Sequence, residues 1–374
     1  MDVFQHIEKP TLVIDVQKAR NNIRWMAEKA KKEGVGFRPH FKTHQSAEIS
    51  GWFKEENISS ITVSSVEMAQ YFFQNGWDDI LIAFPLNWRE IKKIDELAGK
   101  IYLGILIDSD ISLDFLSDHI RNVVAVWIKI DTGLHRVGLA PNDFDNVELL
   151  IRKIRKSPHL KFGGLLTHAG HSYFSLSPEE VINRYQVSIT MMISLQATLM
   201  KRGFGKVFLS VGDTPGCKLS PTMGKIDEIR PGNFIFYDAE QMDLGVCNFD
   251  EIAVLAACPV VSKNHSRNEV VVFGGAVHLS KEHIEKDGKR IYGYIVLPNQ
   301  NGWGKPLAKC YVSALTQEHG VIQLSEEAIG DIQIGDVICI VPIHICLAVH
   351  ALGFYKTFSG REIQTLRTQQ SNTS

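Results

Sequence analysis

The sequence lacks the features that mark exported, membrane-spanning or disulfide-stapled proteins. No basic segment followed by an apolar one opens the chain, so we expect no secretory signal. The longest apolar stretch, Val337 to Val349, is interrupted by Pro342 and His344 and is too short to span a bilayer. The six cysteines, at positions 217, 247, 258, 310, 339 and 346, form no CxxC pair. We therefore expect free thiols in a reducing cytoplasmic compartment and no membrane partner.

An excess of charge of either sign is also absent. The chain has 40 Lys and Arg residues against 42 Asp and Glu residues, which argues against a surface built for nucleic acid. Its 374 residues, 44% of them hydrophobic, have the composition of a soluble globular protein. That length corresponds to about two domains, or to one barrel of about 250 residues with an appendage. A disordered chain, a fibre and a small disulfide scaffold are excluded.

Short β-rich runs alternate with helical patterns from about residue 35 to 230. The eight predicted strands are Val35–His40, Ser60–Val63, Asp79–Ala83, Ile101–Ile107, Val123–Ile130, Phe162–Thr167, Lys206–Val211 and Lys225–Ile229. Helical patterns fit between most of them, as at Ser65–Gln74, where Ser64 and Glu67 have the spacing of a capping box. Eight alternating βα units favour an α/β fold with a (β/α)8 TIM barrel. A doubly wound open sheet is the alternative, but no GxGxxG follows an early strand.

The pattern changes after Arg230-Pro231-Gly232, where short strands follow one another with few helical segments. The predicted strands are Ile252–Val261, Glu269–Phe273, Arg290–Val296, Lys309–Leu315, Val321–Leu324 and Asp336–Val341. Only Lys281–Asp287 has a weak helical pattern. The sequence therefore predicts a barrel at 15–235 followed by a mostly β domain at 236–374, which the N-terminal strand within 1–14 joins. We expect the polar tail from about Thr365 to be disordered.

A cluster of cationic residues ends the first predicted barrel strand, in the run Arg38-Pro39-His40-Phe41-Lys42-Thr43-His44. TIM barrels build their active sites at the carboxyl ends of the strands. A lysine flanked by cationic groups at that place is a candidate nucleophile. A surface lysine that starts a helix is the competing interpretation, and composition and position do not decide between the two.

This run resembles the cofactor-lysine motif of the fold-type III pyridoxal 5'-phosphate (PLP) enzymes. Among them it resembles the D-threonine aldolase and D-serine dehydratase family, whose members carry an RPHxKTH run near the N-terminus. The resemblance implies that Lys42 forms the internal Schiff base with PLP and that His40 lies in the cofactor site. It also implies an alanine racemase-like barrel followed by a β domain, and a homodimer. Further matches occur in the same order from about residue 10 to 350, nearly the whole chain.

Two more segments resemble the family at the ends of predicted strands. Asp131–Gly138 is similar to a DTGxxRxG segment, and Thr167–Tyr173 is similar to an HxGHxY stretch. The resemblance implies that Arg136 reaches the cofactor, that His168 lines its pocket and that Tyr173 approaches the pyridine nitrogen. From the residues alone, Arg136 in a loop ion pair and His168 as a packing residue remain open.

Two glycine-containing turns follow the seventh and eighth predicted strands, where barrels often bind phosphate. Glycine lets backbone N–H groups approach an anion, although most such turns are only turns. The resemblance assigns both turns to the PLP phosphate, through Gly212, Asp213, Thr214, Gly232 and Asn233. Asp213 stands where the family often has Ser or another small residue. Because a carboxylate would repel phosphate, we expect Asp213 to turn its side chain away.

Pro342-Ile343-His344-Ile345-Cys346 places an imidazole and a thiol two residues apart. In a strand they would project from the same face, and both groups are good zinc ligands. A buried core pair is the competing interpretation. The segment resembles the PNHxC or PNHxD motif of the metal-dependent branch, with Ile343 in place of the usual Asn. The resemblance implies that His344 and Cys346 bind a divalent metal, zinc by expectation, and the Cys version is associated with dehydratases rather than aldolases.

Together these segments predict a PLP- and metal-dependent lyase that acts on a small D-β-hydroxy amino acid, most closely a D-serine dehydratase. Gly274–Ser280 departs from the family's DxGxKxxS stretch, while Gln317–Gly320 looks like its SxEHG segment. Retro-aldol cleavage of the D-threonine aldolase type is one alternative. A racemase is another and would need a second base, for which Tyr292, Tyr294 and Tyr311 are available. A non-catalytic PLP-binding protein is the third.

Overall fold

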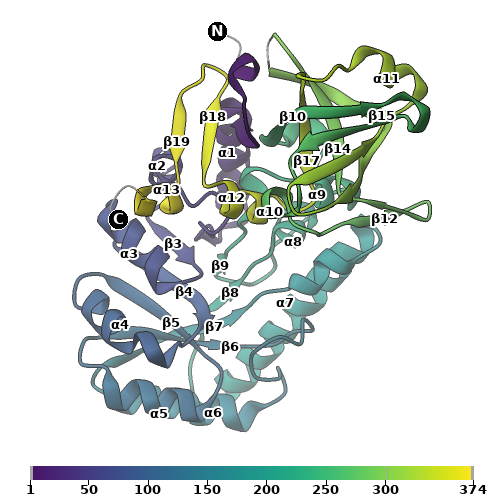
Figure 1. The fold of residues 1–374 in the computed structure, drawn as a ribbon. Helices are drawn as coiled ribbons and strands as arrows, with labels where there is room; N and C mark the ends of the chain where they lie inside the picture. Colours follow the sequence, from purple (N-terminus) through teal and green to yellow (C-terminus); the bar gives the residue numbers. More distant parts are fainter. Residues whose placement is uncertain (1–2, 301, 372–374) are drawn as a thin grey trace. The chain divides into compact units, whose positions relative to one another are not determined.

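The computed structural model describes residues 3–300 and 302–371 (Figure 1). The chain forms two compact units. The barrel unit comprises Trp25–Lys42 and Phe53–Gly232, and the β unit comprises the residues up to Arg24, Thr43–Trp52 and the residues from Asn233 on. Three separate stretches of chain therefore build the β unit.

Eight parallel strands form the sheet of the barrel unit, in the order β2-β9-β8-β7-β6-β5-β4-β3. They are β2 (Gly36–Phe37), β3 (Ser60–Val63), β4 (Asp79–Pro85), β5 (Tyr102–Ile107), β6 (Val124–Lys129), β7 (Leu160–Thr167), β8 (Leu209–Val211) and β9 (Glu228–Ile229). A bridge between His40 and Thr62 joins the segment after β2 to β3, so the first and last strands of the sheet approach one another. The N–H of Phe41 donates to the Thr62 carbonyl at 2.9 Å there. The predicted (β/α)8 barrel is confirmed.

Helices alternate with these strands along the chain, and Figure 1 shows α3 to α6 running along the outer side of the strands. They are α1 (Val16–Glu33), α2 (Ala47–Glu55), α3 (Val66–Gln74), α4 (Ile91–Ala98), α5 (Asp110–His119), α6 (Phe144–Lys156), α7 (Pro178–Lys201) and α8 (Thr214–Leu219), with 3-10 turns η2 (Trp88–Glu90) and η3 (Gly170–Phe174). The cap of α3 is Ser65, whose side chain accepts from the Met68 N–H, so the predicted cap at Ser64 is wrong by one residue.

A large aromatic side chain fills the centre of the barrel unit. Trp127 packs with the buried Leu81, Leu106 and Leu166. A Cβ added to Gly163 would lie 2.7 Å from the Trp127 indole nitrogen, so only glycine leaves room for that ring. The strands themselves are apolar on both faces, as parallel strands covered by helices require.

The β unit contains a nine-stranded sheet in the order β11-β16-β15-β14-β17-β10-β1-β18-β19. Its strands are β1 (Thr11–Ile14), β10 (Val254–Asn264), β11 (Glu269–Phe273), β14 (Gly293–Asn299), β15 (Gly302–Leu315), β16 (His319–Gln323), β17 (Val337–Pro342), β18 (Phe354–Thr357) and β19 (Glu362–Gln364). Strand β10 also pairs with β11, so the six strands from β11 to β10 in this order form a closed ring of paired strands. The N-terminal strand β1 lies between β10, antiparallel, and β18, parallel.

Short helices and one hairpin complete the β unit. They are α9 (Ala239–Asp243), α10 (Ala276–Leu279), α11 (Glu326–Asp331), α12 (Ile345–Leu352), α13 (Leu366–Ser371), the 3-10 turns η1 (Val3–His6), η4 (Asn233–Ile235), η5 (Phe249–Glu251) and η6 (His265–Arg267), and the strands β12 (Ile284–Lys286) and β13 (Lys289–Ile291). Among the described residues, none of the helices is long and apolar enough to cross a membrane.

Three local predictions in the β unit are wrong. Residues 284–286, predicted as weakly helical, form strand β12 of a hairpin. The predicted strand that would carry His344 and Cys346 ends at Pro342, and α12 begins at Ile345. The tail predicted to be disordered forms α13 over Leu366–Ser371, while residues 372–374 lie outside the described residues.

Candidate active site

Lys42 follows the segment that closes the barrel sheet. The preceding residue, Phe41, is fully buried, and its ring contacts those of Phe53, Phe72 and Trp77 at centroid distances of 4.9, 4.9 and 5.1 Å. This aromatic anchor fixes the backbone, so the exposed Lys42 side chain is presented from a rigid base. The Lys42 N–H donates to the His40 Nδ1 at 3.3 Å.

His168 directly follows β7 and lies close enough to Lys42 for the lysine charge to act on the imidazole. Burial first, and then the Lys42 cation, lower the pKa of His168 well below its usual value. The ring is therefore neutral, and its Nδ1 forms a short hydrogen bond with the Gly212 carbonyl oxygen. The structure thus brings together Lys42, His168 and the loop that follows β8.

Arg136 lies in the loop after β6, which Asp131 organises by accepting from the N–H groups of Gly133 and His135 at 3.0 and 3.1 Å. The Arg136 side chain is exposed. Its positive charge acts on the buried Lys129, whose pKa falls to about 7 through burial first, and then through the Arg230 and Arg136 cations. Among the described residues, Arg136 forms no hydrogen bond or ion pair with another predicted site residue.

The two predicted phosphate turns contact each other. The Thr214 hydroxyl accepts from the Gly232 N–H at 3.3 Å. A Cβ on Gly212 would lie 2.8 Å from the Arg230 carbonyl carbon, so the turn needs glycine to pack this closely. The Asp213 carboxylate caps α8 by accepting a hydrogen bond from the Gly216 N–H.

Tyr173 lies in the 3-10 turn η3 and is half-buried. Its neighbour Ser172 donates from Oγ to Asp213 Oδ1 at 3.2 Å, which ties η3 to the turn before α8. Three buried polar atoms near these motifs have no hydrogen-bond partner among the described residues: His171 Nδ1, Asp213 Oδ2 and Asn233 Oδ1. Buried polar atoms are rarely left so, and a polar ligand is one way to satisfy them.

A buried polar network that the sequence did not reveal connects the strands of the barrel. Arg230 donates to Ser210 Oγ at 2.7 Å, and Ser210 donates to Glu228 at 2.6 Å. Glu228 also accepts from Arg38 at 2.8 Å, and Arg38 pairs with Asp79 at 2.7 Å. The network contains two cations and two anions, so its net charge is zero. Only strand register brings Arg38 and Glu228 together, which is why residue spacing could not predict the pair.

His344 and Cys346 lie at the turn from β17 into α12, with His344 as the N-cap. The two side chains are within hydrogen-bond reach of each other despite the absence of the predicted strand. Burial lowers the pKa of His344, but the acidic groups of Cys346, Glu240 and Asp238 outweigh it and raise the pKa to about 12. The acidic groups around His344 therefore favour its protonated form in the absence of another cation.

Two further residues surround this pair. Thr43, the residue after Lys42 in the chain, has its hydroxyl 3.3 Å from the Cys346 sulfur. Glu240, which the sequence analysis missed, lies 3.4 Å from His344 Nδ1. In the described residues no group of three or more His, Cys, Asp or Glu side chains is arranged to hold a metal ion. His344 and Cys346 supply an imidazole and a thiol, the ligand types that bind zinc in proteins.

Asp238 links a predicted phosphate residue to this turn within the β unit. Its Oδ2 accepts from Asn233 Nδ2 at 2.6 Å and from the Ile345 N–H at 3.1 Å. Its Oδ1 caps α9 by accepting from the Gln241 N–H at 3.0 Å. The sequence could have indicated Asp238 as a helix cap, because aspartate is a preferred residue directly before the first turn of a helix.

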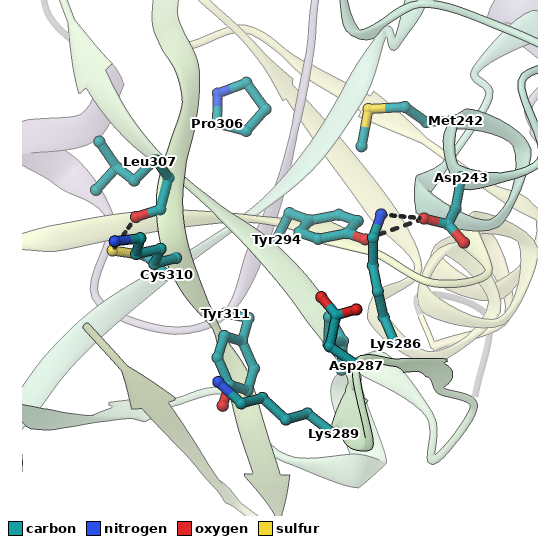
Figure 2. Close-up of a pocket in the computed structure, with 13 residues that line it drawn as sticks. Met242, Asp243, Lys286, Asp287, Lys289, Tyr294, Pro306, Leu307, Cys310 and Tyr311 are labelled. Carbon is teal, nitrogen blue, oxygen red and sulfur yellow. Dashed lines mark hydrogen bonds and ion pairs between the residues drawn. The ribbon is translucent and has the colours of Figure 1, made fainter. Parts of the chain in front are cut away.

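A pocket of about 600 Å³ lies elsewhere in the β unit, lined by the end of α9, the β12–β13 hairpin, β14 and β15 (Figure 2). Asp243 pairs there with Lys286 at 2.8 Å and accepts from the Tyr294 hydroxyl at 3.3 Å. None of the residues assigned above to PLP or metal lines this pocket. Tyr294 and Tyr311, which a racemase could use as a second base, do line it.

Two family matches cover most of the chain. Alanine racemase, N-terminal domain, matches residues 14–240, and the serine dehydratase domain matches residues 253–358. D-serine dehydratase from Dictyostelium discoideum is 30% identical over 381 residues, covering 95% of this chain and 94% of that protein. The chain belongs to the D-serine dehydratase family of fold-type III PLP enzymes.

Other members of the family agree with this assignment. D-threo-3-hydroxyaspartate dehydratase from Delftia sp. (strain HT23) is 26% identical and covers 92% of each chain. A solved structure of that enzyme has a TM-score of 0.89 at 24% identity and covers 98% of this chain and 99% of its own, which shows the fold. The family resemblance drawn from the sequence motifs is therefore confirmed. An exposed lysine beside a neutral histidine, as at Lys42 and His168, suits a covalently held cofactor such as PLP.

Proposed function

We propose that this protein is a PLP- and metal-dependent lyase that converts a D-β-hydroxy amino acid to a 2-oxo acid and ammonia, with D-serine as the first candidate substrate. The observation that carries the proposal is the His344–Cys346 pair beside Glu240. A metal is useful when a poor leaving group such as hydroxide must depart, whereas racemisation removes and returns a proton only. The similarity to D-serine dehydratase along 95% of the chain supports the same conclusion.

Lys42 has two roles in this proposal. Its Nζ holds PLP covalently and, once the substrate amine has taken its place, accepts the α-proton. PLP, when bound, stabilises negative charge at the substrate α-carbon. Neutral His168 lines the site without adding positive charge, and Tyr173 offers a phenol rather than a carboxylate to the pyridine nitrogen. His40 and Arg136 complete the residues that we assign to the cofactor.

The phosphate of PLP would be held by the loops that contain Gly212, Asp213, Thr214, Gly232 and Asn233. The close contacts of Gly212 with Arg230 and the hydrogen bond between Thr214 and Gly232 support a preformed cradle. The buried Oδ1 of Asn233 offers an acceptor to a bound ligand or water.

His344 and Cys346 would hold a divalent metal, which we propose to be zinc because imidazole and thiolate suit it. The metal, when bound, supplies Lewis acidity to the departing β-hydroxyl group. A cysteine-to-alanine variant of a D-threo-3-hydroxyaspartate dehydratase has been solved in a metal-free form. This supports a metal in at least one relative.

We also propose a homodimer in the cytoplasm. The homodimer rests on the family resemblance. The compartment rests on the six buried cysteines, all of which are free thiols in the structure, as expected in a reducing environment.

The product mixture tests the reaction type. Purified protein loaded with PLP is incubated with D-serine and with D-threonine. Pyruvate or 2-oxobutanoate with ammonia supports a dehydratase, whereas glycine with acetaldehyde shows an aldolase. Loss of turnover in EDTA and its return with zinc supports the metal. Racemisation of L-alanine without metal dependence would contradict the proposal, and no turnover of any substrate would favour a PLP-binding protein.

The lysine assignment has a separate test. Lys42→Ala should lose the absorbance band of covalently bound PLP and all turnover, because no other amine is assigned to the cofactor. His6→Ala in the N-terminal turn is a control outside the site. A normal band in Lys42→Ala protein would show that the assignment is wrong.

A further inference from the structure

Asp213 is an unusual residue for a loop that is proposed to hold a phosphate. It follows Gly212 directly and precedes α8, and its residue surface is only 2% exposed. A negative group at this place costs free energy twice, through burial and through repulsion of a bound phosphate. Its presence therefore needs a structural reason.

The contacts of the carboxylate supply that reason. Oδ1 accepts two hydrogen bonds, from the Gly216 N–H at 2.5 Å and from Ser172 Oγ at 3.2 Å. The first belongs to α8 and the second to η3, the turn that presents Tyr173. One oxygen atom thus connects the proposed phosphate loop to the segment proposed to approach the pyridine ring.

Packing makes the same connection rigid. A Cβ on Gly216 would lie 2.1 Å from the Tyr185 ring and 2.8 Å from Asp213 Oδ1, so this turn of α8 has no room to move toward either. The second oxygen, Oδ2, is buried and has no partner among the described residues. A proton could sit on Oδ2 without disturbing either bond made by Oδ1.

Three other groups face the carboxylate. Arg230 follows β9 and is a cation, Tyr185 comes from α7, and Cys217 comes from α8. Burial raises the pKa of the Tyr185 phenol and the Cys217 thiol, so both are neutral at pH 7. Burial also raises the pKa of Asp213 to about 7, although the two hydrogen bonds and Arg230 oppose this.

We infer, on the basis of the proposed PLP site, that Asp213 is a positioning residue that locks the Tyr173 turn to the phosphate loop and takes up a proton when the cofactor binds. The lock sets the distance between the two ends of the cofactor site. The proton removes the repulsion between carboxylate and phosphate while Oδ1 continues to accept both hydrogen bonds. Cofactor affinity therefore falls as pH rises through the neutral range.

Two variants distinguish the effect of the two Oδ1 hydrogen bonds from the effect of the carboxylate charge. Asp213→Ala removes Oδ1 and both hydrogen bonds, and we expect the Kd for PLP to rise about 10- to 100-fold at every pH. Asp213→Asn keeps an acceptor oxygen and removes the titration. We expect it to bind PLP within about threefold of the unaltered protein at pH 6, where the carboxyl group is largely protonated. Ser172→Ala removes one bond only and should have a smaller effect in the same direction.

The experiment titrates apo-protein with PLP between pH 6 and 9 and follows the absorbance of bound PLP. The ratio of the Kd of the unaltered protein to that of Asp213→Asn cancels the pH effects that both share, including those of PLP and Lys42. We expect this ratio to rise with pH. Asp143→Ala is the matched control, because Asp143 caps α6 in the same unit by accepting from the Asn146 N–H. It should leave the Kd for PLP unchanged.

The possible failures can be told apart. If the unaltered protein binds no PLP, or if Lys42→Ala keeps the covalent band, the proposed function fails. If PLP binds through Lys42 but folded Asp213→Ala binds it as tightly as the unaltered protein, the lock is refuted. A pH-independent ratio refutes the proton uptake. Circular dichroism and thermal melting of each apo-variant establish that it is folded, and Asp213→Asn still tests the charge if Asp213→Ala is not.

Discussion

His44 is a fully buried histidine whose Nδ1 accepts from the Ser46 N–H at 3.1 Å. Burial lowers its pKa to about 3. Between that value and about 6.5 the unfolded chain binds a proton at this residue and the folded chain does not, so folding stability is lost as pH falls. We expect His44 to lower the free energy of unfolding by about 1.4 kcal/mol for each pH unit that the pH falls across this window.

The measurement is the free energy of unfolding by urea at pH 7.0 and 4.5. His44→Gln should show a shallower pH dependence than the unaltered protein over this interval. His119→Asn, on the exposed end of α5, is the matched control. Equal slopes for the His44 variant and the unaltered protein would contradict the prediction.

Arg38 is the cation at the centre of the buried barrel network. Arg38→Met leaves Glu228, with a side chain only 6% exposed, without its ionic partner. Removal of one member of a buried pair typically costs about 3–5 kcal/mol, and we expect a loss of that size in urea unfolding. Arg361→Met is the control, because its pair with Glu48 is exposed and worth about 0–1 kcal/mol. Similar losses for both variants would show that burial does not strengthen the first pair.

The sequence predicted some site residues better than others. Lys42 and His168 stand at strand ends, where barrel geometry directs side chains toward one place, and the structure brings them together. Arg230 and Glu228 were missed because their partners come from other strands and depend on register. The roles assigned to the cofactor and metal residues remain predictions.

At the scale of elements, the clearest failure concerns α12. The run around Val337–Val349 is apolar apart from His344, so its hydrophobic residues show neither a period of two nor one of 3.6 residues. Strand β17 and the first turn of helix α12 lie in this run, and most of their residues are buried. A boundary between them cannot be found from hydrophobicity alone.

The β12–β13 hairpin could have been predicted. Asp287-Gly288 separates the paired residues Lys286 and Lys289. Both turn residues have positive φ, at 51° and 70°, as a type I′ turn requires. Asp-Gly is a strong signal for such a turn, and the weak helical pattern over the same residues hid it.

Substitution of alanine for two glycines in different elements should change the stability of the protein in opposite directions. Gly163 in β7 faces the Trp127 indole, and Gly163→Ala should cost about 1–3 kcal/mol through overpacking. Gly51 in α2 has no atom within 4 Å of an added Cβ, and Gly51→Ala should stabilise the protein by about 0.5–1 kcal/mol. Thermal and urea unfolding of both variants measure the difference. Two changes of the same sign would refute this account.

At the scale of the whole molecule, the N-terminal strand β1 is an internal strand of the sheet in the β unit. It lies between β10 and β18, so its removal leaves two unpaired strand edges and an apolar gap. We expect a fragment of residues 233–374 to lack cooperative thermal unfolding. Addition of peptides that span residues 1–24 and 43–52 should restore structure, and replacement of Val13 by Asp in the first peptide should prevent this. Cooperative unfolding of the fragment alone would contradict the prediction.

The position of β1 also has a consequence for the time course of synthesis. About 240 residues separate Ile14 from its partner Val254. At about 5–20 residues per second, the strand therefore waits roughly 10–50 seconds before that partner leaves the ribosome. During this interval Thr-Leu-Val-Ile is an unpaired apolar segment, open to wrong pairing or to a chaperone. The translation rate between these two strands thus sets how long each new chain is exposed to aggregation.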